Sequence, residues 1–500
     1  MRRRVTRFVA ALAVAGVAVV EAAPPASQIG SWEAPRKWPV VGIHAMVLAT
    51  GEVMHYAYEE ARGPEENRVY YEGSRAKIWN PETDKFKDVS WESNVFCSGH
   101  SFLADGKIFV TGGIRQEGCP TEGREETFLF DPFTREWTAY EPMRLPRYYP
   151  TNLTLGDGSV MILSGNNSHC KLVSAMEIME PGEGIRVVKE GKKVFKLYPR
   201  VHLLPDGRVV NVGVEPRTLV FDTTNPSEGW VGVARTNHGE YRWEGTSFQI
   251  PGDPFKVMIC GGFETYEGDR PTDTCEVIDF SEKKPQWRYT APMSQPRGHA
   301  NAVLLPDGKV LVVGGGGHNL YDDPVRQAEI FDPETGRWSP AGLTRWGRMY
   351  HSTAVLIPDG RVISAGQDDV PGGASGAGAF AEFYRPPYLH RGKRPRIKQA
   401  VTTLEYGGEV QMKLKPGKQI EKVVLIRPSA VTHSVNSTQR YVPLEFELIK
   451  GARVTVYGPT NPNEAPPGYY MLFAVNRAGV PSEAVMVQVV PPAPVEEETP

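Results

Sequence analysis

The sequence contains an internal repeat with a period of about 50 residues, and this repeat restricts the fold more than any other feature. Each copy has an apolar run, a turn of the Pro-Asp-Gly-Lys type and a second apolar run that ends in glycines. The Asp-Gly pair of the turn recurs at Asp105-Gly106, Asp157-Gly158, Asp206-Gly207, Asp307-Gly308 and Asp359-Gly360. A degenerate copy at 251–256 fills the one double interval, and another at Thr50-Gly51 precedes the series, so the chain has seven equivalent units.

Each unit continues into a later strand with a recurring phrase, such as Phe331-Asp332-Pro333 ahead of Trp338. The period, the glycine ends and the outer tryptophan are typical of the kelch pattern, in which each unit is a four-stranded blade of a β-propeller. The seventh unit lacks a tryptophan-bearing strand after Phe380, and the segment around Trp32 resembles that missing strand. We therefore predict an all-β fold with a seven-bladed kelch-type propeller over residues 24–385, closed by the Trp32 segment.

The pattern changes near Tyr384, where alternating apolar runs separated by Gly and Pro turns begin. These runs predict a C-terminal immunoglobulin-like β-sandwich over residues 386–490. The last residues, 491–500, are rich in Pro and Glu and are predicted to form a disordered tail.

The first 23 residues are typical of an export signal. Four arginines among the first seven residues are followed by an apolar stretch at 8–20 and by small residues at Ala22 and Ala23. This stretch of 13 residues is shorter than the roughly 20 that a membrane-spanning helix needs. We predict a signal peptide over 1–23 and an extracellular or periplasmic protein, with an uncleaved membrane anchor as the alternative.

The composition argues against one class of partner. The formal net charge is −3 and no long basic stripe is present, so the sequence offers no electrostatic basis for binding nucleic acid.

Disulfides are expected among the five cysteines, because an exported protein folds in an oxidising compartment. Cys119 and Cys170 follow the second strands of neighbouring units, and Cys260 and Cys275 lie on the two strands of one hairpin. We predict these two disulfides, which leaves Cys97 over.

Eight positions before each turn aspartate, at the start of the innermost strand, the repeat places chemically active residues: Cys97, Tyr149, Tyr198, His299 and His351. Equivalent positions in successive blades form a ring around the propeller axis. A polar rim hydrogen-bonded to water in the pore is one explanation of this ring. As a set, the five residues favour a functional site.

The sequence also contains residue types that bind metals, although spacing alone does not single out two of its eleven histidines. Copper(II) favours imidazole nitrogen and oxygen ligands. His351 and His433 can supply the nitrogens, and Tyr149 and Tyr350 can supply the oxygens. The His-x-x-x-His and His-Glu-x-x-His phrases of zinc sites do not occur in the sequence.

The local phrases resemble those of the copper radical oxidases, the family of galactose oxidase and glyoxal oxidase. The phrases that carry the resemblance are Val95-Phe96-Cys97-Ser98-Gly99, Arg147-Tyr148-Tyr149-Pro150, Arg348-Met349-Tyr350-His351-Ser352, Thr432-His433-Ser434-Val435-Asn436 and Gly468-Tyr469-Tyr470-Met471-Leu472-Phe473. The resemblance covers roughly residues 30–490. No sugar-binding N-terminal domain precedes it, so the architecture is similar to that of glyoxal oxidase and its bacterial relatives.

The resemblance implies one copper per chain, with Tyr149, Tyr350, His351 and His433 as ligands. It implies a protein-derived radical cofactor, in which a thioether joins the sulfur of Cys97 to the ring of Tyr149. Cys97, Tyr149 and Tyr350 are then the catalytic residues, with Tyr350 as the general base.

The same resemblance implies a secreted, monomeric oxidase whose partners are a small molecule and dioxygen. Small aldehydes of the glyoxal and methylglyoxal type would react as hydrates, and dioxygen would be reduced to hydrogen peroxide. A copper radical oxidase of primary alcohols or carbohydrates is the first alternative, and a non-enzymatic kelch binding module is the second.

Four residues are candidates for the substrate pocket. Tyr198, Glu244 and His299 belong to neighbouring blades, and His169 stands near the position of the aromatic residue that stacks on the radical tyrosine in galactose oxidase. For the first three, hydrogen bonding along the pore is the alternative explanation. For the stacking position, a tryptophan from elsewhere in the chain remains the alternative.

Overall fold

The computed structural model describes residues 24–62, 69–115, 119, 121–367, 377–398, 401–415, 420–449 and 453–491. The predicted signal peptide at 1–23 and residues 492–500 of the predicted tail lie outside the described residues. Within the described ranges, no helix is both long enough and apolar enough to cross a membrane. The anchor at the N-terminus and the boundaries of the domains therefore stay predictions.

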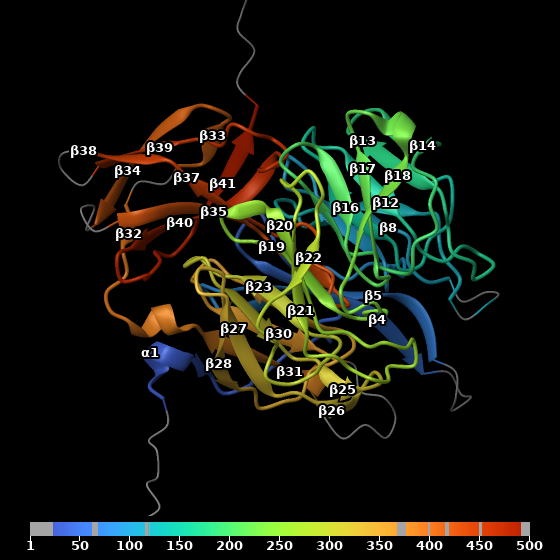
Figure 1. Cartoon of the computed structure of the whole chain (residues 1–500), viewed down its shortest axis with the longest axis horizontal. Coiled ribbons are helices and arrows are strands. Elements are labelled where there is room, and N and C mark those ends of the chain that lie inside the picture. The colour runs from blue at the N-terminus through green and yellow to red at the C-terminus, as the bar shows by residue number, and fades with distance from the viewer. Residues whose placement is uncertain are drawn as a thin grey trace, which may run out of the picture.

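The fold is a seven-bladed β-propeller followed by an immunoglobulin-like sandwich, as predicted (Figure 1). Blades 2 to 6 are antiparallel sheets with the following strands, from the innermost outward. Blade 2 has β7 (Gly99–Phe102), β8 (Ile108–Thr111), β9 (Thr127–Asp131) and β10 (Glu136–Tyr140). Blade 3 has β11 (Thr151–Thr154), β12 (Val160–Leu163), β13 (Met176–Glu180) and β14 (Gly184–Val188), and blade 4 has β15 (Val201–Leu203), β16 (Arg208–Asn211), β17 (Arg217–Asp222) and β18 (Trp230–Arg235). Blade 5 has β19 (Thr246–Ile250), β20 (Asp253–Cys260), β21 (Cys275–Asp279) and β22 (Trp287–Tyr289), and blade 6 has β23 (Asn301–Leu304), β24 (Val310–Val313), β27 (Gln327–Asp332) and β28 (Arg337–Leu343).

Short elements connect these strands. A hairpin of β25 (Gly316–His318) and β26 (Asp322–Pro324) is inserted in blade 6. The helical segments of the described chain are α1 (Ala26–Ile29) and the 3-10 turns η1 (Pro226–Glu228), η2 (Ala377–Ala379) and η3 (Pro387–His390).

Blade 7 is closed by the N-terminal segment. Its strands are β29 (Ser352–Leu356), β30 (Val362–Gly366), β31 (Phe380–Arg385) and β1 (Ser31–Trp32), and β2 (Arg36–Lys37) also pairs with β31. Trp32 lies opposite Tyr384 in this pairing, with ring centroids 4.9 Å apart, and its indole nitrogen donates to the Ala341 carbonyl of blade 6. The predicted closure by the Trp32 segment is confirmed.

Blade 1 receives a fifth strand from the second domain. Its own strands are β3 (His44–Val47), β4 (Val53–Arg62), β5 (Val69–Asn80) and β6 (Lys85–Asp88), and β36 (Ala430–Thr432) pairs with β3 on the inner edge. A segment far away in sequence is thereby held beside the propeller axis by backbone hydrogen bonds.

The second domain contains two packed sheets (Figure 1, orange to red). One sheet has β32 (Arg396–Ile397), β34 (Glu409–Lys415), β39 (Arg453–Tyr457) and β38 (Phe446–Ile449); the other has β33 (Thr403–Glu405), β41 (Val485–Val490), β40 (Gly468–Asn476), β35 (Ile420–Arg427) and β37 (Arg440–Leu444). Val424 and Phe473 of this domain belong to the same apolar core as Val303 and Leu304 of blade 6, so the two domains share buried surface.

A buried ion pair recurs beneath the starts of four blades. In these blades an arginine stands two or three residues before the residue that opens the blade, and it pairs with a glutamate of the third strand. The pairs are Arg147 with Glu177, Arg242 with Glu276, Arg297 with Glu329 and Arg348 with Glu382. The same glutamates also accept backbone N–H groups, for example that of Ser294 on Glu329. These pairs fix the loops that carry the ring residues.

Candidate functional site

Blades 2 to 7 each begin with a residue in the left-handed backbone region. The φ angle is 58° at Cys97, 64° at Tyr149, 47° at Tyr198, 54° at Glu244, 62° at His299 and 64° at His351. Such angles are uncommon for residues other than glycine. Their recurrence shows that the same tight turn opens each blade, and Glu244 takes this place in the unit with the degenerate sequence.

Four chain segments meet at one point: Cys97 of blade 2, Tyr149 of blade 3, Tyr350 with His351 of blade 7, and His433 of the second domain. The Cys97 sulfur lies 3.7 Å from His433 Nε2, and the Tyr149 hydroxyl lies 3.1 Å from the same nitrogen. The Tyr149 hydroxyl also forms a hydrogen bond with the Tyr350 hydroxyl. The ligand atoms of Cys97, His351 and His433 all lie within 4.8 Å of one another.

Burial differs within this cluster. Cys97, His351 and His433 are buried, whereas Tyr149 and Tyr350 keep some exposed surface. The accessible side of the cluster is therefore the side on which the two tyrosines lie.

Hydrogen bonds fix the ring of His433, which follows β36. The Thr432 hydroxyl donates to the Ile43 carbonyl over 3.0 Å, so it accepts from His433 Nδ1, at 2.6 Å. This network assigns the proton of the neutral imidazole to Nδ1 and leaves the lone pair on Nε2, the nitrogen that faces the cluster. Burial, with His351 and His44 nearby, lowers the pKa of His433 well below its ordinary value, which keeps the ring neutral.

Desolvation acts in the opposite direction on the two phenols. Burial in the cluster, with Cys97 as the next cause, raises the pKa of Tyr149 and of Tyr350 well above the ordinary value, although each ring keeps some exposed surface. Without a cation, both phenols are thus protonated. Imidazole nitrogens and phenol oxygens are ligands that copper(II) accepts, and a bound cation favours the phenolate form. The donor set is therefore chemically suited to a copper ion.

Two aromatic rings stack on Tyr149. The centroid of Tyr148 lies 4.2 Å away at 17°, and that of Tyr198 lies 4.6 Å away at 25°. His169 is exposed and forms a hydrogen bond with the Ser168 hydroxyl. The structure thus brings the pocket candidate Tyr198 to the cluster and leaves His169 at the surface. Sequence reasoning missed Tyr148, although it stands in the same phrase as Tyr149.

A charged group borders the cluster on the side of blades 4 to 6. The Glu244 carboxylate lies 3.2 Å from the Arg200 guanidinium and 3.8 Å from His299 Nδ1, and its side chain is 26% exposed. Burial lowers the pKa of His299 to about 4, with Glu244 opposing this effect, so the imidazole is neutral near pH 7. The His299 ring lies 5.5 Å from that of Tyr350, which connects this border to the cluster.

The cysteines follow the predicted pairing. Disulfides join Cys119 to Cys170 and Cys260 to Cys275, and Cys97 is buried outside both.

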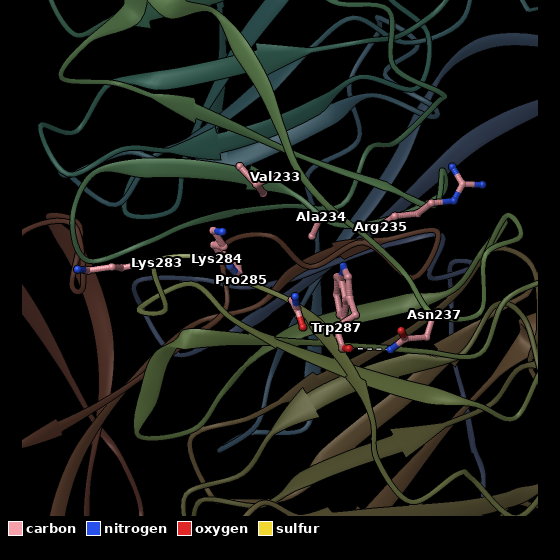
Figure 2. A pocket seen from close by; sticks show the side chains of 9 residues that line it. Val233, Ala234, Arg235, Asn237, Lys283, Lys284, Pro285 and Trp287 are labelled. Atoms are coloured by element: carbon pink, nitrogen blue, oxygen red, sulfur yellow. Dashed lines mark hydrogen bonds between the residues drawn. The ribbon is translucent and has the colours of Figure 1, made fainter.

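A separate pocket of about 560 Å³ lies between blades 4 and 5 (Figure 2). Its lining comes from β18, from Asn237 and from residues 283–287, which lead into β22, and Asn237 donates to the Trp287 carbonyl over 2.7 Å. None of the predicted site residues lines this pocket. It is therefore distinct from the buried cluster.

Two family models match the chain. The model described as glyoxal oxidase N-terminus matches residues 73–371, and the model described as galactose oxidase-like, early set domain matches residues 394–489.

Individual relatives span both domains. A WSC domain-containing protein of Arthroderma benhamiae is 29% identical over 84% of this chain, which spans only 48% of that protein's length. Aldehyde oxidase GLOX of Vitis pseudoreticulata is 29% identical over 83% of this chain and 85% of its own, and galactose oxidase of Gibberella zeae is 25% identical over 93% and 71%. Among solved structures, a fungal alcohol oxidase of the AA5 family in complex with copper has a TM-score of 0.80 at 26% identity, covering 92% of this chain and all of that one.

Proposed function

Because the chain belongs to the copper radical oxidases, the family of glyoxal oxidase and galactose oxidase, we propose that its buried cluster is a mononuclear copper site that oxidises a small substrate and releases hydrogen peroxide. The observation that carries this proposal is the meeting of Cys97, Tyr149, His351 and His433 from three blades and a second domain. A kelch module that only binds partners would not need this set, so the second alternative is set aside.

Copper would be held by Tyr149, Tyr350, His351 and His433. When bound, it supplies a one-electron acceptor beside an oxidisable tyrosine, which together take two electrons from a carbinol group and pass them to dioxygen. A thioether between Cys97 and the Tyr149 ring makes that ring easier to oxidise by donating electron density.

Two phenol oxygens of the protein would accept the two hydrogens that the substrate loses. Tyr350 Oη receives the hydroxyl proton of the substrate as general base, and Tyr149 Oη, one hydrogen bond away, receives the hydrogen of the adjacent carbon. The rings of Tyr148 and Tyr198 stack on the ring of Tyr149 and restrain its orientation. Thr432 keeps His433 Nε2 directed at the cluster.

The substrate we propose is a small aldehyde that reacts as its hydrate. Glu244 lies at the accessible border beside His299 and can accept a hydrogen bond from the second hydroxyl of a hydrated aldehyde. The match to the glyoxal oxidase model and the 85% coverage of a plant aldehyde oxidase support this choice. The relatives named galactose oxidase and alcohol oxidase support the alternative, a primary alcohol or carbohydrate. We further propose that the protein is secreted, which the predicted N-terminal signal and the disulfides support. We also propose that it acts as a monomer, because one chain supplies all four proposed ligands.

Peroxide release tests the function directly. Copper-loaded, oxidant-activated protein should release hydrogen peroxide with glyoxal and methylglyoxal faster than with glycolaldehyde or galactose. Tyr350→Phe should lower turnover by roughly 10²–10⁴-fold, the usual contribution of a general base. The absence of peroxide with all four compounds would exclude the oxidase function, and a preference for galactose would select the alternative substrate class.

A further inference from the structure

Backbone hydrogen bonds join three pairs of ring residues in neighbouring blades. The Tyr149 N–H donates to the Cys97 carbonyl over 3.0 Å, Tyr198 N–H to the Tyr149 carbonyl over 3.1 Å, and His299 N–H to the Glu244 carbonyl over 2.8 Å. In each case the residue that opens one blade is fixed by the residue that opens the preceding blade.

The backbone N–H of Cys97 has a different acceptor from those of Tyr149, Tyr198 and His299. The residue equivalent to it in blade 1 is Gly42, whose carbonyl accepts the Thr353 hydroxyl of blade 7 over 2.8 Å. The Cys97 N–H donates instead to a side chain, His44 Nε2, at 3.1 Å. A histidine of blade 1 thus takes the place of the backbone carbonyl at the one ring position that holds the cysteine.

His44 is itself held firmly. It lies opposite Tyr56 across β3 and β4, and the two rings stack with centroids 4.2 Å apart at 7°. Because Nε2 accepts from Cys97, the ring proton is on Nδ1, which donates to His100 Nε2 over 3.1 Å. His44 and Tyr56 are fully buried, so neither hydrogen bond is exchanged easily with water.

Tyrosines of blades 1 and 4 also fix Ser98, the residue after the cysteine. The Tyr56 hydroxyl forms a 2.9 Å hydrogen bond with the Ser98 hydroxyl, and the Tyr198 hydroxyl donates to the Ser98 carbonyl over 3.0 Å. The turn at Cys97 is therefore restrained on both sides by groups that are not ligands in the proposed copper site.

We infer that His44 is a positioning residue for the Cys97 to Tyr149 thioether: its Nε2 holds the Cys97 backbone so that the sulfur faces Tyr149. This role rests on the proposed function, because it presupposes that the thioether forms. The bond replaces the S–H of Cys97 and one ring C–H of Tyr149. The two hydrogens, with their two electrons, reduce one dioxygen to hydrogen peroxide, with copper as the catalyst.

Two amide substitutions separate the contacts of His44. In His44→Gln the amide reaches the position of Nε2 and can still accept from the Cys97 N–H, whereas in His44→Asn the shorter amide reaches only the position of Nδ1. Protein purified without copper is mixed with copper and dioxygen, and the joined peptides, lighter by roughly 2 Da because two hydrogens are lost, are followed over time by mass spectrometry. Unfolding in urea is measured for both variants, and His44→Leu replaces His44→Asn should that variant not fold.

The expected result is a thioether that forms in His44→Gln within about threefold of the wild-type rate, and at least about tenfold more slowly in His44→Asn or His44→Leu. Equal rates in Gln and Asn variants of equal stability, or a wild-type rate in His44→Leu, would overturn the role of His44 while leaving the oxidase proposal intact. A wild-type protein that forms no thioether with copper and dioxygen would overturn the proposed cofactor, and the role of His44 with it.

Discussion

At the scale of single residues, the ring combines a strained backbone with reactive side chains. A non-glycine residue in the left-handed region costs of order 1 kcal/mol or more, and the structure contains six in equivalent places. The strain persists because the surrounding groups restrain each turn, as the Cys97 N–H bond to His44 illustrates. Replacements that keep a Cβ atom therefore test the side chain without changing the backbone requirement.

Cys97→Ala is one such replacement. The variant should fold and bind copper, because the sulfur is outside the proposed ligand set, yet its peroxide turnover should fall by roughly tenfold or more. Copper titration and peroxide release measure the two properties separately. Wild-type turnover in Cys97→Ala would contradict the radical mechanism.

His55 of β4 gives a prediction about pH. Its ring is buried, neither ring nitrogen has a hydrogen-bond partner among the described residues, and burial, with Arg348 as a smaller cause, lowers its pKa to about 3. As the pH falls below about 6.5, the unfolded state takes up a proton that the folded state refuses, so stability is lost. The loss from this side chain is about 2 kcal/mol at pH 5.

His55→Leu should remove that part of the pH dependence. Urea unfolding of the metal-free protein at pH 7 and pH 5 measures it. The variant should lose about 2 kcal/mol less than the wild type between the two pH values. An unchanged difference would show that His55 is protonated as readily in the folded protein as in the unfolded chain.

At the scale of elements, the recurring arginine–glutamate pairs hold the blade starts to the third strands. Arg297 and Glu329 are both buried, with a 2.7 Å contact between guanidinium and carboxylate. Removing one partner of a buried pair leaves the other charge without compensation, which costs roughly 3–5 kcal/mol. The pairs therefore stabilise the loops that carry His299 and its equivalents.

Glu329→Gln should accordingly lower the free energy of unfolding by about 3 kcal/mol. Glu282→Gln is the matched control, because Glu282 contacts Arg288 over a similar 2.8 Å but the two side chains are 35% and 59% exposed, and its effect should stay below about 1 kcal/mol. Urea unfolding compares the two variants. Equal losses would show that burial does not set the contribution of these pairs.

At the scale of the whole molecule, the cluster draws on both domains. His433 arrives on β36, which the second domain adds to blade 1, while the other proposed ligands belong to blades 3 and 7. Copper binding should therefore stabilise the propeller and the second domain together.

The size of this stabilisation by copper depends on the concentration of free copper relative to its dissociation constant. Free copper at one hundred times its dissociation constant should raise the free energy of unfolding by about 2.7 kcal/mol, and a chelator should reverse the gain. Urea unfolding with and without copper measures it. His433→Gln, which removes the ligand from the second domain, should reduce the gain; the same gain in this variant would exclude His433 as a ligand.

The sequence by itself determined the blade count, the closing strand at Trp32 and the two disulfides. A fixed period maps equivalent positions onto a ring, so spacing along the chain predicts neighbours in space. Cys97, Tyr149, Tyr198, His299 and His351 could be grouped for this reason alone. The phrase around His433 pointed to the site only through its resemblance to a family.

Tertiary structure alone decided the contacts that no period describes. The pairing of β36 with β3 brings His433 and Thr432 to the propeller axis, and it depends on how two domains pack rather than on any local spacing. The stacking of Tyr148 and Tyr198 on Tyr149, with His169 left at the surface, follows from side-chain directions in three loops. The Cys97 N–H donates to His44 while the Gly42 carbonyl accepts the Thr353 hydroxyl of blade 7, an arrangement of groups from blades 1, 2 and 7 that exists only once the ring is closed.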